Sequence, residues 1–197
     1  MENYNSRGRI RNLLLFPRWE WKTINLEKRT LKETFISYAL PLILLGAVSK
    51  FLGSFLYVRN VLDIDAYRFS LPLIHAGYFI FLQVLTIMIT TVFVYGLSGS
   101  FLSVKDYSKS GKVVIYSYTP VYLLFIIANL HSSLDFIMLP GFYSIVLLWT
   151  GLPVLLQTPT NKLPAYVIIL VISVFGIQYI SELLLKLLTT LIFPGVV

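Results

Sequence analysis

The sequence contains no cysteine and few charged residues. Without cysteine, the 197-residue chain has no disulfide bond, zinc–thiolate site or thiol nucleophile. Only 13% of its residues are charged and 57% are hydrophobic, whereas a soluble globular domain is roughly 25% charged. A water-soluble fold has no way to cover so much apolar surface, so the composition predicts that lipid surrounds much of the chain.

Short catalytic motifs are absent as well. No HExxH, GxSxG or GxGxxG pattern occurs, and Ser108–Lys112 lacks the first glycine and the final Ser or Thr of a phosphate-binding loop. The first apolar stretch follows a long basic segment, which is the wrong order for a cleaved signal peptide. The sequence therefore predicts a protein that is not an enzyme and needs no cofactor.

Long runs free of Asp, Glu, Lys and Arg occupy residues 69–104, 113–134, 136–161 and 163–181. About 20 apolar residues cross the hydrocarbon core as a helix, and backbone groups in lipid must be bonded internally. The predicted fold class is all-α, a polytopic bundle of five transmembrane helices; a β-barrel is not expected because alternating polarity is absent. The predicted spans are Thr34–Val58, Leu71–Leu97, Val113–Leu130, Leu139–Gln157 and Pro164–Leu191.

The distribution of basic residues predicts the orientation of these spans. Twelve of the sixteen Lys and Arg residues fall on the side of the amino-terminal segment, and Arg59 and Arg68 fall on the other side. The positive-inside rule therefore places the amino terminus in the cytoplasm and the carboxyl terminus outside. A re-entrant pair formed by spans four and five would reduce the crossings to four or fewer.

Residues 1–33 form a basic amphipathic arm, followed by a transmembrane domain over residues 34–197. Tryptophan beside basic residues suits the headgroup layer of a membrane, and Pro17 prevents one continuous helix, so we expect a short interfacial helix and then a turn. Docking of a partner protein is the alternative. The residues expected to contact anionic lipid headgroups are Arg7, Arg9, Arg11, Arg18, Trp19, Trp21 and Lys22.

Two of the ionisable residues within the predicted spans, Lys50 and Glu182, are candidates for a functional role. Lys50 and Glu182 are predicted to lie at similar depths, roughly 24 and 27 Å along their helices from the cytoplasmic side. They form either a structural ion pair between spans one and five or part of a transport path, and Lys186 is a competing partner for Glu182. Snorkelling of both side chains to the outer interface is a further alternative.

Two histidines and a carboxylate fall on the predicted outer side. His75, His131 and Asp135 have the chemistry of zinc ligands, which leaves a metal-dependent membrane enzyme as an alternative. No spacing fixes His75 near the other two, so no metal site is predicted.

Other residues suggest how the helices pack. A proline, Pro120, frees a backbone carbonyl that neighbouring hydroxyls can satisfy. It ends the segment Tyr116, Ser117, Tyr118, Thr119 and Pro120. The small residues Gly46 and Gly53 allow close approach of another helix. Helix packing is the expected role of both groups, and a permeation path is the alternative.

Four motifs together resemble a known family. They are Leu14–Ile24 (LLFPRWEWKTI), Tyr38–Leu42 (YALPL), Tyr116–Pro120 (YSYTP) and Trp149–Leu152 (WTGL). In this order they resemble prokaryotic members of the Ypt-interacting-protein (Yip) domain family of five-span membrane proteins, over about residues 10–190. The resemblance implies the five-span architecture and carries over no catalytic residue. With the charge pattern it implies a prokaryotic cytoplasmic (inner) membrane.

The resemblance also bears on partners. Eukaryotic relatives are linked to Rab-type GTPases and to vesicle traffic, but their Asp-Leu-Tyr-Gly-Pro signature is absent here, which puts GTPase binding in doubt. The predicted function is a membrane scaffold, adaptor or trafficking-type factor, and the rival is a small transporter or channel using Lys50 and Glu182. The expected partners are anionic headgroups and other membrane proteins or a second copy of the chain, with no nucleic acid.

Overall fold

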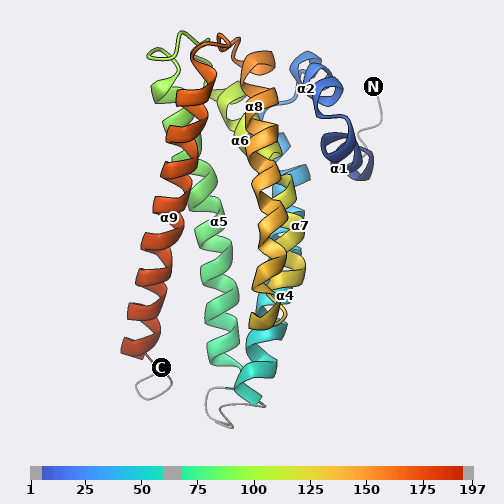
Figure 1. Ribbon diagram of the computed structural model, residues 1–197. Helices are drawn as coiled ribbons and strands as arrows, with labels where there is room; N and C mark the ends of the chain where they lie inside the picture. Colours follow the sequence, from blue (N-terminus) through green and yellow to red (C-terminus); the bar gives the residue numbers. More distant parts are fainter. Residues whose placement is uncertain (1–5, 60–67, 193–197) are drawn as a thin grey trace.

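Within the described part of the chain, five long helices run side by side and two short helices lie beside one end of them (Figure 1). The structure, a computed structural model, describes residues 6–59 and 68–192. Five helices are long and apolar enough to cross a membrane, and each lies within a few residues of its predicted span. They are Leu31–Tyr57, Ser70–Leu97, Tyr107–Ala128, Phe136–Leu155 and Leu163–Leu191. The predicted all-α transmembrane bundle is thus confirmed.

Several of these spans are built from more than one element. The arm contains α1 (Ser6–Leu15) and α2 (Pro17–Leu26), and the first span joins α3 (Leu31–Thr34), a π-helix (η1, Phe35–Ala39) and α4 (Leu40–Tyr57). The remaining elements are α5 (Ser70–Leu97), α6 (Tyr107–Ser117), α7 (Thr119–Ala128), the 3₁₀ helix η4 (Ser132–Phe142), α8 (Tyr143–Leu155) and α9 (Leu163–Ile192).

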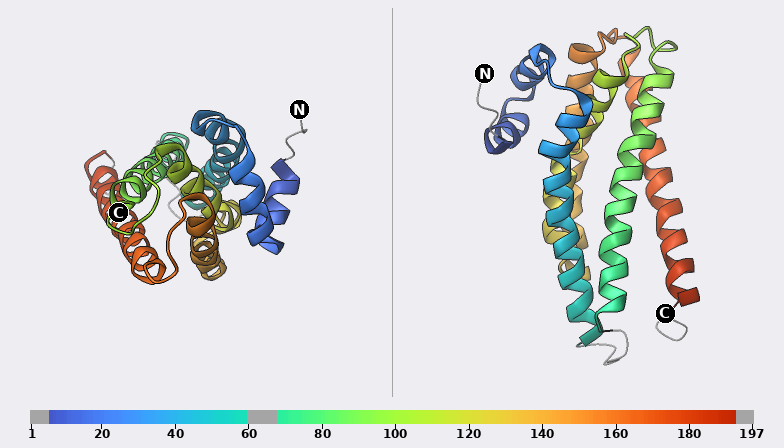
Figure 2. Two further views of the ribbon diagram at one scale, coloured as in Figure 1. Left: turned by 90° about the horizontal axis from the view of Figure 1, so that it is seen from above. Right: turned by 180° about the vertical axis from the view of Figure 1, so that it is seen from behind.

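The helices run roughly parallel to one long axis (Figure 1). The arm, the α5–α6 connection and the α8–α9 connection lie together at one end, here called the arm end, and α9 runs the full length to the opposite end, the far end. Seen from above, the arm lies on one flank of the bundle and α9 on the other (Figure 2). All the predicted basic connecting segments are therefore at the arm end.

The third span forms the centre of the bundle. The most apolar window of this span is 67% buried, whereas that of the last span is only 17% buried. Every residue from 110 to 120 is buried, because α6 packs against α3, α5 and α8. In contrast, α9 packs on α5 and α8 and leaves most of its apolar surface for lipid.

Several prolines lie within the spans, and the helix is locally irregular near two of them, Pro41 and Pro120. Ahead of Pro41 the first span widens into the π-helix, in which the Leu40 N–H donates to the carbonyl of Phe35. At Pro120 the third span breaks at Tyr118, and the hydroxyl of Thr119 donates to the carbonyl of Tyr116 at 2.6 Å. The Tyr116 carbonyl is the one that an interior proline cannot bond, so the hydroxyl replaces the missing amide.

Glycine is required above all at residue 53, where two helices approach each other closely. A Cβ atom at Gly53 would lie 2.2 Å from the carbonyl oxygen of Asn129, so α4 meets the end of α7 with no room for a side chain. Gly46 faces Phe79 more loosely, since a Cβ there would lie 3.0 Å from the ring. Gly77, inside α5, is exposed, and a Cβ atom there would meet nothing within 4 Å.

Replacing Gly53 by alanine should therefore destabilise the protein. We expect Gly53→Ala to lower the free energy of unfolding by about 1–3 kcal/mol, because backbone atoms of α7 must move away. The matched variant Gly77→Ala should be neutral or stabilising by up to about 1 kcal/mol, because alanine favours the helix and meets no neighbour. Thermal unfolding in detergent, followed by circular dichroism, measures both; equal shifts for the two variants would contradict the close approach.

Candidate functional site

Four segments that are far apart in the sequence meet at the arm end. We call their contact the arm junction, and its residues are Trp21, Tyr38, Tyr116, Thr119 and Gly151. The three aromatic side chains are fully buried. The ring centroid of Tyr116 lies 6.2 Å from that of Trp21 and 4.7 Å from that of Tyr38, both with edge-to-face geometry. Such contacts stabilise beyond the area that they bury, so the arm is packed as part of the protein core.

Hydrogen bonds fix the orientation of these rings. The indole nitrogen of Trp21 donates to the hydroxyl of Thr150 at 3.1 Å. The hydroxyl oxygens of Tyr38 and Thr119 are 2.7 Å apart, and Thr119 in turn donates to the carbonyl at the Pro120 break. The break in the third span and the position of the arm are therefore parts of one network.

Gly151 provides the space that Trp21 occupies. A Cβ atom at Gly151 would lie 2.7 Å from two atoms of the indole ring, which is closer than real Cβ atoms approach. Because the ring is wedged between α6 and α8, a side chain at residue 151 would displace the arm.

Arg9 holds the arm together from within. Its guanidinium lies 3.2 Å from the carboxylate of Glu20, forms a second ion pair with Glu27, and stands 5.5 Å from the centroid of the Tyr116 ring. Burial lowers the pKa of Arg9, but Tyr116 and the two carboxylates together raise it further, so the net shift is upward. Arg9 therefore stays charged and joins α1, α2 and α6.

The structure divides the residues predicted to contact headgroups into two groups. Arg9 and Trp21 are 7% and 0% exposed, so they are turned inward and do not reach lipid, which corrects the prediction for these two. Tertiary packing, rather than the headgroup layer, satisfies their polar and apolar parts. The remaining described members of the set are exposed: Arg11, Arg18, Trp19 and Lys22. The side chain of Arg7 lies outside the described part.

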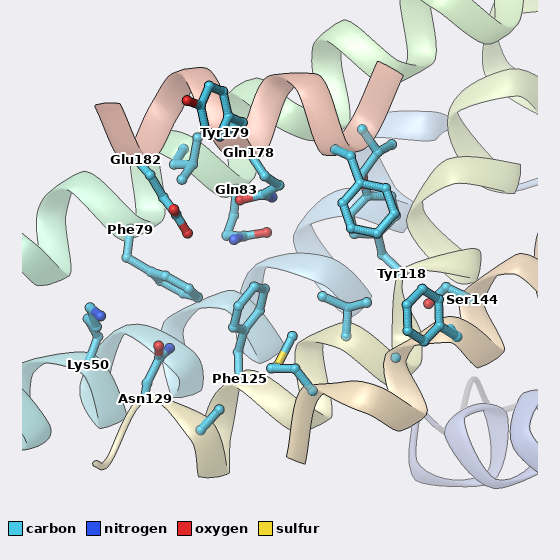
Figure 3. Close-up of a pocket in the computed structure, with 18 of the residues that line it drawn as sticks. Lys50, Phe79, Gln83, Tyr118, Phe125, Asn129, Ser144, Gln178, Tyr179 and Glu182 are labelled. Carbon is cyan, nitrogen blue, oxygen red and sulfur yellow. The ribbon is translucent and has the colours of Figure 1, made fainter. Parts of the chain in front are cut away.

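A second feature is a cavity of about 1110 Å³, whose lining extends from Lys50 and Glu182 to Tyr118 at the break in the third span (Figure 3). It is lined by residues of α5, α7, η4, α8 and α9 and by one residue of α4, Lys50. Most of its wall is apolar, contributed by side chains such as Leu82, Val121, Phe125 and Val174. We call it the intramembrane cavity.

Lys50 and Glu182 both line the intramembrane cavity, from opposite sides (Figure 3). In the described part of the chain no ion pair joins them, and none joins Glu182 to Lys186. The predicted Lys50–Glu182 pair is therefore not formed, because α4 and α9 stand on either side of the cavity. Two opposite charges face one space without neutralising each other.

The polar residues of α5 and α7 complete this cavity and were missed by the sequence analysis. Gln83, Thr86 and Thr90 are buried on one face of α5, and Gln83 lines the cavity together with Asn129 of α7. Their spacing of three and four residues inside an apolar span is the signal that points to an inward polar face.

The two histidines considered as zinc ligands each contact a neighbouring serine. The imidazole Nδ1 of His75 lies 2.9 Å from the hydroxyl of Ser54, and that of His131 accepts from the Ser133 amide at the start of η4. The side chain of Asp135 lies outside the described part. Among the residues that the structure does describe, no three His, Cys, Asp or Glu side chains form a group able to hold a metal.

These features define a class of protein: a polytopic membrane protein of five helices whose amino-terminal arm is folded onto one end. Comparison with family models matches residues 11–181 to the Yip1 domain. The chain therefore belongs to the Yip1 domain family, as its motifs predicted. Comparison with curated proteins and with solved structures finds no match.

The motifs that carried the resemblance lie together in space. Each of the four segments contributes to the arm junction: Trp21 from the first, Tyr38 from the second, Tyr116 and Thr119 from the third, and Gly151 from the fourth. The family pattern in this chain therefore marks the contact between arm and bundle.

Removing the charge of Arg9 should release the arm. In Arg9→Met, Glu20 and Glu27 keep their negative charges in a largely buried site without a cation, at a cost of about 3 kcal/mol. We expect hydrogen exchange in α1 and α2 to speed up by about a hundredfold while the exchange of α5 is unchanged.

The matched control is Arg11→Met, two residues along the same helix, where the side chain is exposed. This variant should leave the exchange of α1 and α2 as in the unaltered protein. Equal exchange in Arg9→Met and Arg11→Met would show that the buried ion network does not hold the arm.

Proposed function

We propose that this protein is a non-enzymatic membrane scaffold or adaptor of the trafficking type, which acts through its docked arm. The observation that carries the proposal is the arm junction, where Trp21 and Arg9 fix the arm rigidly against the bundle. A rigidly placed arm presents its outer surface at a fixed height and angle, which is what a scaffold requires of a contact surface.

The outer surface of the arm combines basic and large apolar side chains. Trp19 is 73% exposed and Leu26 is 83% exposed, although both are apolar. The ammonium group of Lys22 stands 5.1 Å from the centroid of the Trp19 ring. The exposed side chains of this surface are Arg11, Leu15, Phe16, Arg18, Trp19, Lys22 and Leu26. This chemistry matches the headgroup layer of a membrane that contains anionic lipid.

The proposed location is a prokaryotic cytoplasmic membrane with the amino terminus in the cytoplasm. It is supported by the excess of Lys and Arg in the segments that lie together at the arm end. The proposed partners are anionic lipids and other membrane proteins or a second copy of the chain. Binding of a GTPase is not part of the proposal, because the corresponding signature is absent from the sequence.

Contact of the arm with headgroups can be measured at Trp19. In nanodiscs containing anionic lipid brominated near the headgroup, Trp19 should be quenched strongly, and Arg18→Gln with Lys22→Gln should reduce the quenching. High salt should weaken it too, because it screens the attraction. Subtracting the emission of the Trp19→Phe variant from that of the unaltered protein leaves the emission of Trp19 without that of Trp21 and Trp149.

Trp149 provides the internal control, because it lies within α8 and should respond to neither salt nor the arm substitutions. Quenching of Trp19 that is the same in purely neutral nanodiscs and is insensitive to salt would contradict electrostatic contact of the arm with headgroups.

The scaffold role predicts protein contacts at the arm. A photo-crosslinking residue at Leu26 should give discrete protein adducts in native membranes, and these should decline in Arg9→Met, in which the arm is loosened. The matched probe at Leu191, which is 73% exposed at the far end of α9, should not give the same adducts.

Identical adducts from both positions, or adducts with lipid alone at Leu26, would contradict the scaffold.

The rival is a small transporter or channel, which is favoured by the presence of Lys50 and Glu182 in one cavity. Reconstituted vesicles are expected to show no solute or ion flux. Flux that is lost in Glu182→Gln would support the transporter and overturn the scaffold.

A further inference from the structure

We propose that the intramembrane cavity binds one zwitterionic amino-phospholipid, with its headgroup between Lys50 and Glu182 and its acyl chains along the apolar walls. The lipid would be a resident ligand of the bundle. The site is separate from the arm, because no residue of α1, of α2 or of the arm junction lines the cavity.

The opposite charges at the cavity select the headgroup. Lys50 projects from α4 and Glu182 from α9, and both side chains point toward the same space (Figure 3). Ionised groups within a span are costly unless a counter-ion is present, and neither has one among the described residues. A phosphate beside Lys50 and an ammonium group beside Glu182 would neutralise both charges.

The walls of the cavity suit acyl chains. From the level of Lys50 and Glu182 the cavity continues toward the middle of the bundle, past Phe125, Leu148 and Val171. Its volume of about 1110 Å³ slightly exceeds the roughly 300–1,000 Å³ of ordinary small-molecule pockets. The space is only partly enclosed, and one of its walls is α9, the least buried of the five spans, so we expect a lipid to enter from the bilayer beside α9.

The buried side chain of Gln83 is a second, separate observation that supports a ligand in the cavity. Its side chain is 1% exposed, lines the cavity, and has an amide oxygen without a hydrogen-bond partner. A buried amide oxygen without a hydrogen-bond donor costs free energy, so a ligand that brings a donor or an ordered water to this depth is favoured. The ammonium group of an amino-phospholipid headgroup is such a donor.

Other occupants match these observations less well. Water would satisfy Gln83 but gains nothing from the apolar walls. An anionic phospholipid without an amine, such as phosphatidylglycerol, would pair with Lys50 but would bring no cation to Glu182. An apolar peptide segment would fill the walls but leave both charges and the amide unsatisfied.

The test is native mass spectrometry of the full-length protein in nanodiscs made of equal parts phosphatidylethanolamine and phosphatidylglycerol. After release from the nanodisc, the unaltered protein should retain one phosphatidylethanolamine in preference to phosphatidylglycerol. Lys50→Met and Glu182→Gln should each reduce the retained fraction by about tenfold, because each removes one charged hydrogen-bonding partner.

Lys186→Met is the matched control. Lys186 lies one helical turn beyond Glu182, is exposed, and does not line the cavity. This variant should retain the lipid as the unaltered protein does. Circular dichroism and the elution volume in size exclusion show whether each variant is folded.

Several outcomes would overturn the proposal. Equal retention of both lipids by the unaltered protein would show only annular lipid, and preference for phosphatidylglycerol would show that Glu182 does not select the headgroup. A protein released without lipid, or a co-purifying peptide in its place, would also refute it. The comparison of the two lipids uses the unaltered chain, so it tests the proposal even if a variant fails to fold.

Discussion

Hydrocarbon offers no hydrogen-bond partner to a peptide group, and this constraint shapes the whole chain. It makes each apolar run a helix, and it requires compensation wherever proline removes an amide. At Pro120 the hydroxyl of Thr119 replaces that amide, and ahead of Pro41 a π-helical turn absorbs the mismatch. Both irregularities lie where the arm meets the bundle, so compensation within the membrane also determines where Tyr38 and Tyr116 stand.

The arm is held by interactions that are common in soluble proteins. Trp21 fills the space above Gly151, and Arg9 is enclosed by two carboxylates and the ring of Tyr116. Burying a charged network is costly, so its main effect is to specify one position of the arm rather than to add stability. The arm is consequently both an interfacial segment and a part of the protein core, with different side chains serving each role.

The arm end and the intramembrane cavity differ in whether their charged side chains have partners within the chain. At the arm end the buried cation is enclosed by partners from the chain itself, and the family motifs converge there. At the intramembrane cavity Lys50 and Glu182 face each other without pairing. The match to the Yip1 domain spans all the segments that form the arm junction, and the cavity is lined by residues of α4, α5, α7, η4, α8 and α9.

The sequence by itself determined the number, type and approximate limits of the spans, because hydropathy and length depend only on local composition. It also indicated the break at Pro120 and the close approach at Gly53. It did not reveal that Arg9 and Trp21 turn inward, since an amphipathic basic segment has the same pattern on lipid and on protein. Only the tertiary structure decided that, and it likewise separated Lys50 from Glu182, because side-chain partners depend on how helices rotate and pack against one another.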